Sequence, residues 1–172
     1  MNPKLEALFD EPERAYLQTD ELNALSQFVS SLPERITLYQ RLRNEEVTLM
    51  QSVADALQQQ FSREPEEKLK RSLQNAILMV RYAAMAMLTD DADIVTKRLE
   101  TWLPEIITAY ETRDIDMALY KLIKTQFAGR FSPTQMALLA PGINAAERLI
   151  AESGSPAESE EEITSETLVS LF

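Results

Sequence analysis

Residues 64–88 read EPEEKLKRSLQNAILMVRYAAMAML, and the second half of this stretch is the most apolar run in the chain. Arg81 is the only charged residue among the thirteen residues from Ala76 to Leu88. Because thirteen residues form only about 20 Å of helix and a bilayer needs about 20 apolar residues, we interpret the run as protein core rather than a membrane span. A helix that is apolar on every side lies in the middle of a domain, so we expect the other elements to pack around this one.

The composition excludes several classes of function. At 172 residues, with 45% hydrophobic and 26% charged side chains, the chain fits one soluble domain with a sizeable core. Three glycines leave no room for a nucleotide-phosphate loop. The absence of histidine and cysteine excludes disulfides, thiol nucleophiles, histidine triads, ordinary zinc sites and histidine-ligated haem. We therefore predict no cofactor, no metal and no enzymatic activity; the carboxylate pairs Glu66/Glu67 and Asp114/Asp116 are typical of helix starts.

The net charge of −11 argues against a nucleic-acid partner, because affinity for phosphate backbones comes from basic patches. Six of the 28 acidic residues, and none of the bases, lie from Glu152 onward, so the rest of the chain is only mildly acidic. The N-terminus, MNPKLEALFDEPE, is not typical of a signal peptide. We therefore expect a cytoplasmic protein that is not inserted in a membrane.

Helical spacing of apolar residues runs through most of the chain and predicts an all-α fold of about seven helices, with no strand. A short N-terminal segment, 1–18, precedes the first full helix. The predicted helices cover residues 20–32, 33–61, 64–88, 94–110, 114–128 and 132–150. We expect Pro104 and Pro141 to kink or split the helices that contain them, and we interpret residues 89–93 (TDDAD) as a turn and helix cap rather than a metal loop.

The central stretch resembles a known family, the phycobiliproteins. Residues 81–92 read RYAAMAMLTDDA, and that family carries a similar Arg-Tyr-Ala-x-x-Ala-Met-Leu-x-Gly-Asp motif followed by a comparable helix. Residues 16–22 (YLQTDEL) resemble the family's entry into its first globin-type helix, and residues 119–124 (LYKLIK) its following segment. The resemblance covers roughly residues 10–128. It implies a globin-like helical subunit with an N-terminal helical extension, which pairs with a second subunit in the cyanobacterial phycobilisome.

The chain departs from this family at the pigment. The family holds a linear tetrapyrrole by a thioether in a Cys-x-Arg-Asp stretch nine residues before the arginine that Arg81 matches. In this chain, Ser72, Gln74 and Asn75 replace the cysteine, arginine and aspartate of that stretch. Serine forms no thioether, glutamine offers no charged bond to a propionate, and neutral asparagine does not stabilise protonated pyrrole nitrogens. The sequence therefore predicts a subunit without a bilin.

The partner surface is expected to remain. In the family, the arginine matching Arg81 reaches an acid near the N-terminus of the partner subunit, and Glu11 would supply the reciprocal acid here. We predict that Glu11, Tyr16, Arg81 and Tyr82 form this interface in a homodimer or heterodimer. An ion pair between Arg81 and an acid of its own chain is the alternative. The other apolar residues of the central helix, including Met85 and Met87, are interpreted as core.

The sequence divides into a helical domain, residues 1–151, and an acidic tail, residues 152–172. The start of the tail is too polar to collapse, so we expect disorder there. Its end is apolar and could either stay untethered or dock on a groove. The candidate docking residues are Ile163, Leu168, Leu171 and Phe172.

Two functions are compatible with these observations. The resemblance favours a pigment-free interaction protein that binds phycobiliprotein subunits or other phycobilisome components, in assembly, turnover or acclimation of the antenna. Such a protein would work in the cytoplasm, at the thylakoid surface with phycobilisomes. The alternative is a haem-free globin-like sensor that binds a fatty acid or a free bilin between its helices.

Overall fold

The described part of the chain folds into α-helices only, as the periodicity predicts. The computed structural model describes residues 2–9 and 16–153, and no strand occurs within these ranges. The seven helices are α1 (Pro3–Ala7), α2 (Thr19–Gln60), α3 (Glu66–Thr89), α4 (Asp93–Leu99), α5 (Leu103–Tyr110), α6 (Arg113–Ala128) and α7 (Pro133–Glu152). Most boundaries lie within a few residues of the predicted ones.

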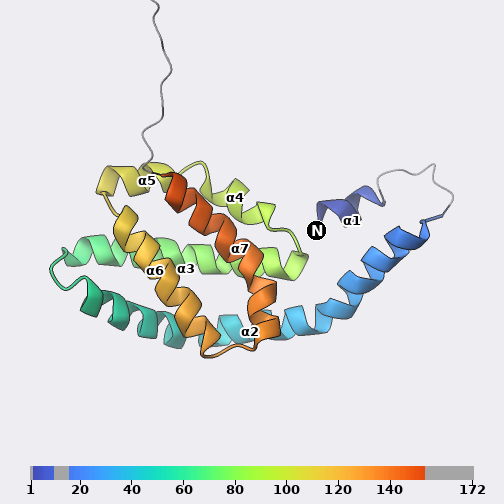
Figure 1. Ribbon diagram of the computed structural model, residues 1–172, viewed down its shortest axis with the longest axis horizontal. Coiled ribbons are helices and arrows are strands. Elements are labelled where there is room, and N and C mark those ends of the chain that lie inside the picture. Colours follow the sequence, from blue (N-terminus) through green and yellow to red (C-terminus); the bar gives the residue numbers. More distant parts are fainter. Residues whose placement is uncertain (1, 10–15, 154–172) are drawn as a thin grey trace, which may run out of the picture.

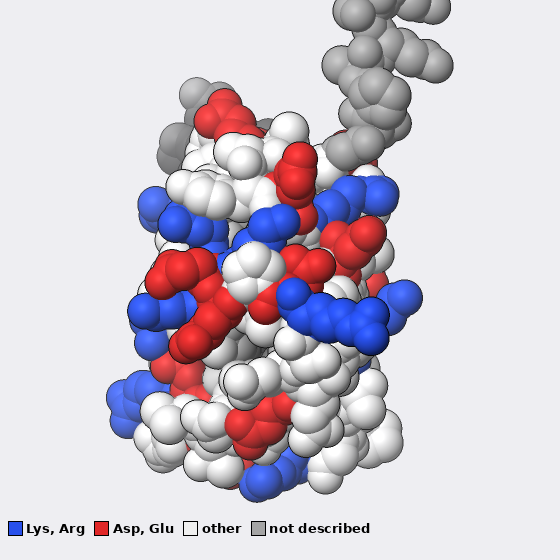
Figure 2. Space-filling model, turned by 90° about the vertical axis from the view of Figure 1, so that its left-hand side faces the viewer, with Lys and Arg blue, Asp and Glu red and all other residues white. Residues whose placement is uncertain are grey.

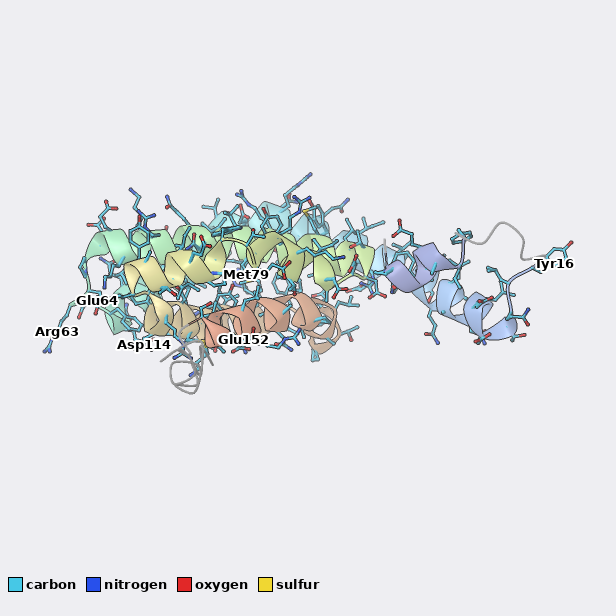
Figure 3. The ribbon with its side chains drawn as sticks, turned by 90° about the horizontal axis from the view of Figure 1, so that it is seen from above. Tyr16, Arg63, Glu64, Met79, Asp114 and Glu152 are labelled. Atoms are coloured by element: carbon cyan, nitrogen blue, oxygen red, sulfur yellow. The ribbon has the colours of Figure 1, made fainter. Side chains whose placement is uncertain are left out.

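The central helix of the sequence, α3, is also the central helix of the fold. It contacts α2, α4, α6 and α7, and in Figure 1 α6 and α7 cross in front of it while α2 runs below it. Met79, Val80, Ala84 and Met87 are buried as predicted, and Met79 lies in the middle of the body in Figure 3. The closest approach is to α7, where only hydrogen atoms of Gly142 separate its backbone from Ala83. Glycine is required here because a Cβ would lie 2.9 Å from the Ala83 Cα.

The first two predicted helices form one continuous helix, so the predicted break at Pro33 is wrong. Pro33 is exposed and lies inside the 42-residue α2. Its missing N–H removes one helical hydrogen bond, while its carbonyl still accepts a bond from the Thr37 hydroxyl at 2.8 Å. The body buries the later part of α2, through Leu38, Leu49 and other residues, and this packing outweighs the local cost of the proline.

The earlier part of α2 projects beyond the body. We call residues 19–36 of α2, together with α1, the arm. Figure 1 shows the arm leaving the bundle, and Figure 3 places Tyr16 at its outer end, with a side chain that is 88% exposed. The predicted N-terminal helical extension is therefore present as a projecting element. Residues 1 and 10–15, which also precede α2, lie outside the described ranges.

The other two prolines behave differently. Pro104 lies in the first turn of α5, so the predicted helix 94–110 is split into α4 and α5. Pro141 lies inside α7, which continues through it. The turn after α3 was predicted correctly: Asp90 caps that helix in the left-handed conformation, with φ 55° and ψ 43°.

Candidate functional site

The three predicted pigment-site positions lie on α3 but face different surroundings. Ser72 is fully buried, Asn75 is half-buried and Gln74 is exposed. The Oγ of Ser72 and the Nδ2 of Asn75 are buried, and neither has a hydrogen-bond partner among the described residues. The hydroxyl at position 72 is therefore enclosed by protein, where a thioether to a pigment would have to leave the chain.

A second polar cluster, which the sequence did not reveal, lies beside Ser72. Thr112 and Asp116 are 1% and 3% exposed, and the Thr112 hydroxyl donates a 2.7 Å hydrogen bond to Asp116 Oδ2. Tyr120, one turn further along α6, is equally buried. Asp114 and Asp116 were both interpreted as helix-start residues. Both lie in the first turn of α6, as predicted, but the side chain of Asp116 is also buried in the core, which was not predicted.

Burial controls the protonation of this cluster. It raises the pKa of Asp116, an effect that the hydrogen bond from Thr112 opposes. Ser72 also lowers this pKa by its proximity, although its hydroxyl lies outside normal hydrogen-bond geometry. Burial raises the pKa of Tyr120 well above its usual value, and the charges of Asp116 and Glu147 add to the rise. The cluster can hold a proton, but it presents no activated nucleophile, and the described residues contain no set of acids that could hold a metal.

Arg81 is paired within its own chain. Its Nε and Nη2 donate to the two carboxylate oxygens of Glu46 on α2, both at 2.7 Å. This hydrogen bonding lowers the pKa of Glu46, against the effect of burial, so the pair is ionised at neutral pH. The Arg81 side chain is 57% exposed. Glu11, its predicted partner from a second subunit, lies outside the described residues, so that pairing stays a prediction.

The expectation that α3 is covered on every side was wrong. Leu78 and Met85, at either side of Arg81, are 38% and 42% exposed. Val47, next to Glu46 on α2, is 79% exposed. We call these three residues, together with the Arg81–Glu46 pair, the α3 face. Met85, interpreted as core, is therefore a surface residue, whereas Tyr82 packs partly against the core.

The arm presents a second apolar surface. Leu22, Val29 and Ile36 recur every seven residues along α2 and are 51%, 54% and 46% exposed. Leu25 and Leu32, between them, are half-buried. We call these five residues the arm stripe. Their alternating spacing of three and four residues is that of a helix seam that packs against another helix.

Comparison with protein families matches residues 9–149 to the family described as phycobilisome protein. The chain belongs to the phycobilisome protein family. A search of curated proteins finds no match to it. The predicted resemblance and globin-like helical fold are thereby confirmed, and a phycobilisome-related role follows. Members of this family are light-harvesting structural proteins rather than enzymes.

The residues of this phycobilisome protein do not fit a covalently bound bilin. The chain has no cysteine, so no position can form the thioether. Ser72, the residue that the resemblance matches to the attachment cysteine, is fully buried next to Asp116. A bilin therefore has no covalent attachment point in this chain.

Two other features of the phycobilisome protein bear on binding. A groove of about 370 Å³ lies between the end of α2 and the start of α3, with Leu57, Phe61, Leu69 and Leu73 among its lining residues. Figure 2 shows the end of the body opposite the arm, where acidic and basic side chains are interspersed rather than gathered by sign.

No helix in the described ranges is long and apolar enough to span a membrane. The tail residues Ile163, Leu168, Leu171 and Phe172 lie outside those ranges, and their docking stays a prediction.

Proposed function

We propose that this phycobilisome protein is a pigment-free subunit that binds phycobiliprotein subunits at the antenna, in its assembly, turnover or acclimation. The observation that carries the proposal is the exposure of apolar side chains on the arm stripe and the α3 face. An apolar surface left in water at two places on one α-helical chain is typical of an interaction site.

The charges of the α3 face agree with this role. Because Arg81 is held by Glu46 in a bidentate pair, the centre of this face carries no net charge. A partner can therefore cover Leu78, Met85 and Val47 without leaving an uncompensated charge, which would be costly. The arm stripe extends the apolar surface along a helix that a second helical subunit can pack against.

Paired substitutions on the arm test the proposal. Leu22→Lys with Val29→Lys places two charges on the arm stripe, whereas Asn23→Lys with Ser30→Lys places the same charges, at the same spacing, on another side of α2. Sedimentation of the chain alone and mixed with isolated phycobiliprotein subunits measures self-association and complex formation. We expect only the first variant to lose association. Equal binding by both variants, or no binding by the wild type at micromolar concentration, would remove the proposal.

A charge exchange distinguishes an Arg81 that pairs only with Glu46 of its own chain from one that also contacts Glu11 of a second subunit. Arg81→Glu with Glu46→Arg keeps an ion pair within the chain but reverses the sign at position 81. If the partner's Glu11 contacts that position, the double variant loses association, and adding Glu11→Arg restores it. If association is unaffected by the exchange, Arg81 serves only its own chain and the intersubunit pair with Glu11 is wrong.

A haem-free sensor that binds a fatty acid or a free bilin is the second candidate. The groove near Phe61 favours it, because its volume is at the lower end of the range of about 300–1,000 Å³ for ligand sites. Oleic acid or biliverdin should then raise the melting temperature of the wild type and not of Leu73→Glu. A wild type unaffected by either compound would exclude this candidate.

A further inference from the structure

A buried arginine lies where the arm meets the body. Arg35 is 7% exposed and lies two residues after Pro33, at the inner end of the arm stripe. A buried guanidinium is stable only when its charge is paired and its donors are satisfied. The residues that pair with Arg35 therefore show which elements hold the inner end of the arm in place.

These residues come from the end of α3 and from the arm itself. Nη2 of Arg35 lies 2.7 Å from Asp90 Oδ1, and Nη1 donates to the carbonyl of Met87. On the arm side, Nε donates to the hydroxyl of Ser31 at 2.8 Å, and the guanidinium carbon lies 5.8 Å from the centre of the Phe28 ring. The guanidinium is thus shared between the two parts of the molecule.

Asp90 connects a third element. Its second carboxylate oxygen, Oδ2, accepts a 2.8 Å hydrogen bond from Nδ2 of Asn2, just before α1. Its backbone is in the left-handed conformation that favours glycine, and the family motif quoted above has glycine at this position. In this chain an acid takes that conformation, and its carboxylate joins both parts of the arm, α1 and the start of α2, to the end of α3.

The surroundings of this pair are loosely packed. A cavity of about 310 Å³ borders Arg35 and Asp90 on the side of α1, where Leu5 and Phe28 line it. A smaller cavity of about 100 Å³ borders the same two residues on the side of α7. The arm is also continuous with the body through α2, but Pro33 removes one hydrogen bond of that helix at this junction, so α2 can bend here. Besides the helix itself, the polar contacts of Arg35 and Asp90 are therefore the specific connection between arm and body.

We propose that Arg35 and Asp90 form a latch that holds the arm at a fixed angle to the body, and that the arm swings when the latch opens. The latch is a conformational device built into the end of α3. It bears on the proposed function because it fixes the direction in which the arm stripe is presented. A binding surface that is held in its bound orientation avoids the ordering cost of association.

Distances between spin labels test the latch in the free chain. The sequence has no cysteine, so Ser26→Cys on the arm and Lys97→Cys on α4 create the only two labelling sites. Pulsed electron paramagnetic resonance then gives the distribution of distances between arm and body. Asp90→Asn and Asp90→Gly remove the carboxylate while tolerating the left-handed backbone. Asp93→Asn removes an exposed acid from the adjacent helix and is the matched control.

We expect one narrow distribution in the parent and in Asp93→Asn, and a broader or shifted one in both Asp90 variants, with unchanged helical content by circular dichroism. A narrow, unshifted distribution in the Asp90 variants would overturn the proposal. A broad distribution in the parent, or equal broadening by Asp93→Asn, would overturn it as well.

This measurement needs no partner, so its result is independent of whether the proposed function is correct. Binding to phycobiliprotein subunits gives a second, separate readout. If an open latch leaves one arm in ten in the bound orientation, the apparent Kd of Asp90→Asn rises about tenfold. Failure of all forms to bind would contradict the proposed function and leave the distance result to decide on the latch.

Discussion

Replacing Gly142 by alanine tests how closely α7 lies on α3. The added Cβ would lie 2.9 Å from the Cα of Ala83 and 3.1 Å from its Cβ, whereas carbon atoms normally stay about 3.5–4.0 Å apart. Because one of these atoms is helix backbone, α7 has to move away by roughly 0.6–1.1 Å, the difference between 2.9 Å and normal contact. Such overpacking costs about 1–3 kcal/mol. Alanine regains about 1 kcal/mol through its better helix propensity.

Gly129→Ala is the matched control, because its Cβ would meet nothing closer than the Gln126 carbonyl at 3.5 Å. Its backbone, with φ −76° and ψ −14°, suits any residue. Gly129 caps α6 whereas Gly142 lies inside α7, so the gain in helix propensity is smaller at Gly129. The clash itself corresponds to roughly 2–12 °C in Tm for a domain of this size. Thermal unfolding followed by circular dichroism measures the difference.

A third variant locates the contact. Adding Ala83→Gly to Gly142→Ala removes the clash with the Cβ but not the one with the Cα, so we expect partial recovery. A Gly142→Ala protein that melts at or above the temperature of Gly129→Ala would refute the reasoning, since it would mean that α7 moves off α3 at no cost.

Three further predictions concern the buried cluster, the core and the pigment. Folding raises the pKa of Asp116, so ionisation of this carboxyl destabilises the fold as the pH rises from its pKa in the unfolded state through its pKa in the folded state. Asp116→Asn should therefore raise the melting temperature at pH 7. This gain should shrink below about pH 4, where the carboxyl is protonated in both states. An unchanged pH dependence of melting would contradict this. Ala84→Asp, at a position 5% exposed, buries an unpaired charge and should give insoluble or molten protein, as solubility and near-ultraviolet circular dichroism would show. Co-expression with a bilin-making pathway should yield colourless protein, because Ser72 forms no thioether; an absorption band that survives denaturation would disprove this.

The sequence predicted the helices better than their junctions. Apolar periodicity identified α3, α6 and α7, but the sequence around each proline did not show which prolines would interrupt a helix. Pro104 splits its helix because it lies where a new first turn can begin, at α5. At Pro33 the buried residues of α2 all follow the proline, from Arg35 onward. Pro141 is inside a continuous helix because buried residues on both sides of it, such as Leu139 and Ile143, outweigh one missing hydrogen bond. That balance depends on tertiary contacts, which a single sequence does not contain.

The candidate site divides in the same way. The loss of the pigment-attachment residue can be seen from Ser72 alone. The partner of Arg81 could not be identified from the sequence, because Glu46 is 35 residues away and several other acids could form the same ion pair. Asp116 was missed although a signal existed. Thr112, Asp116 and Tyr120 recur every four residues, which places all three on the buried face of α6.

The continuity of α2 has a consequence for the lifetime of the protein. One helix forms both the arm and a wall of the core, so a partner that binds the arm recognises only the folded chain. Such a partner stabilises the fold by about 2.7 kcal/mol at a free concentration one hundred times its Kd. Chains produced in excess of the partner would lack this protection and would be degraded sooner than bound chains. The abundance of the protein would then follow the supply of its partner, with no dedicated control of its synthesis.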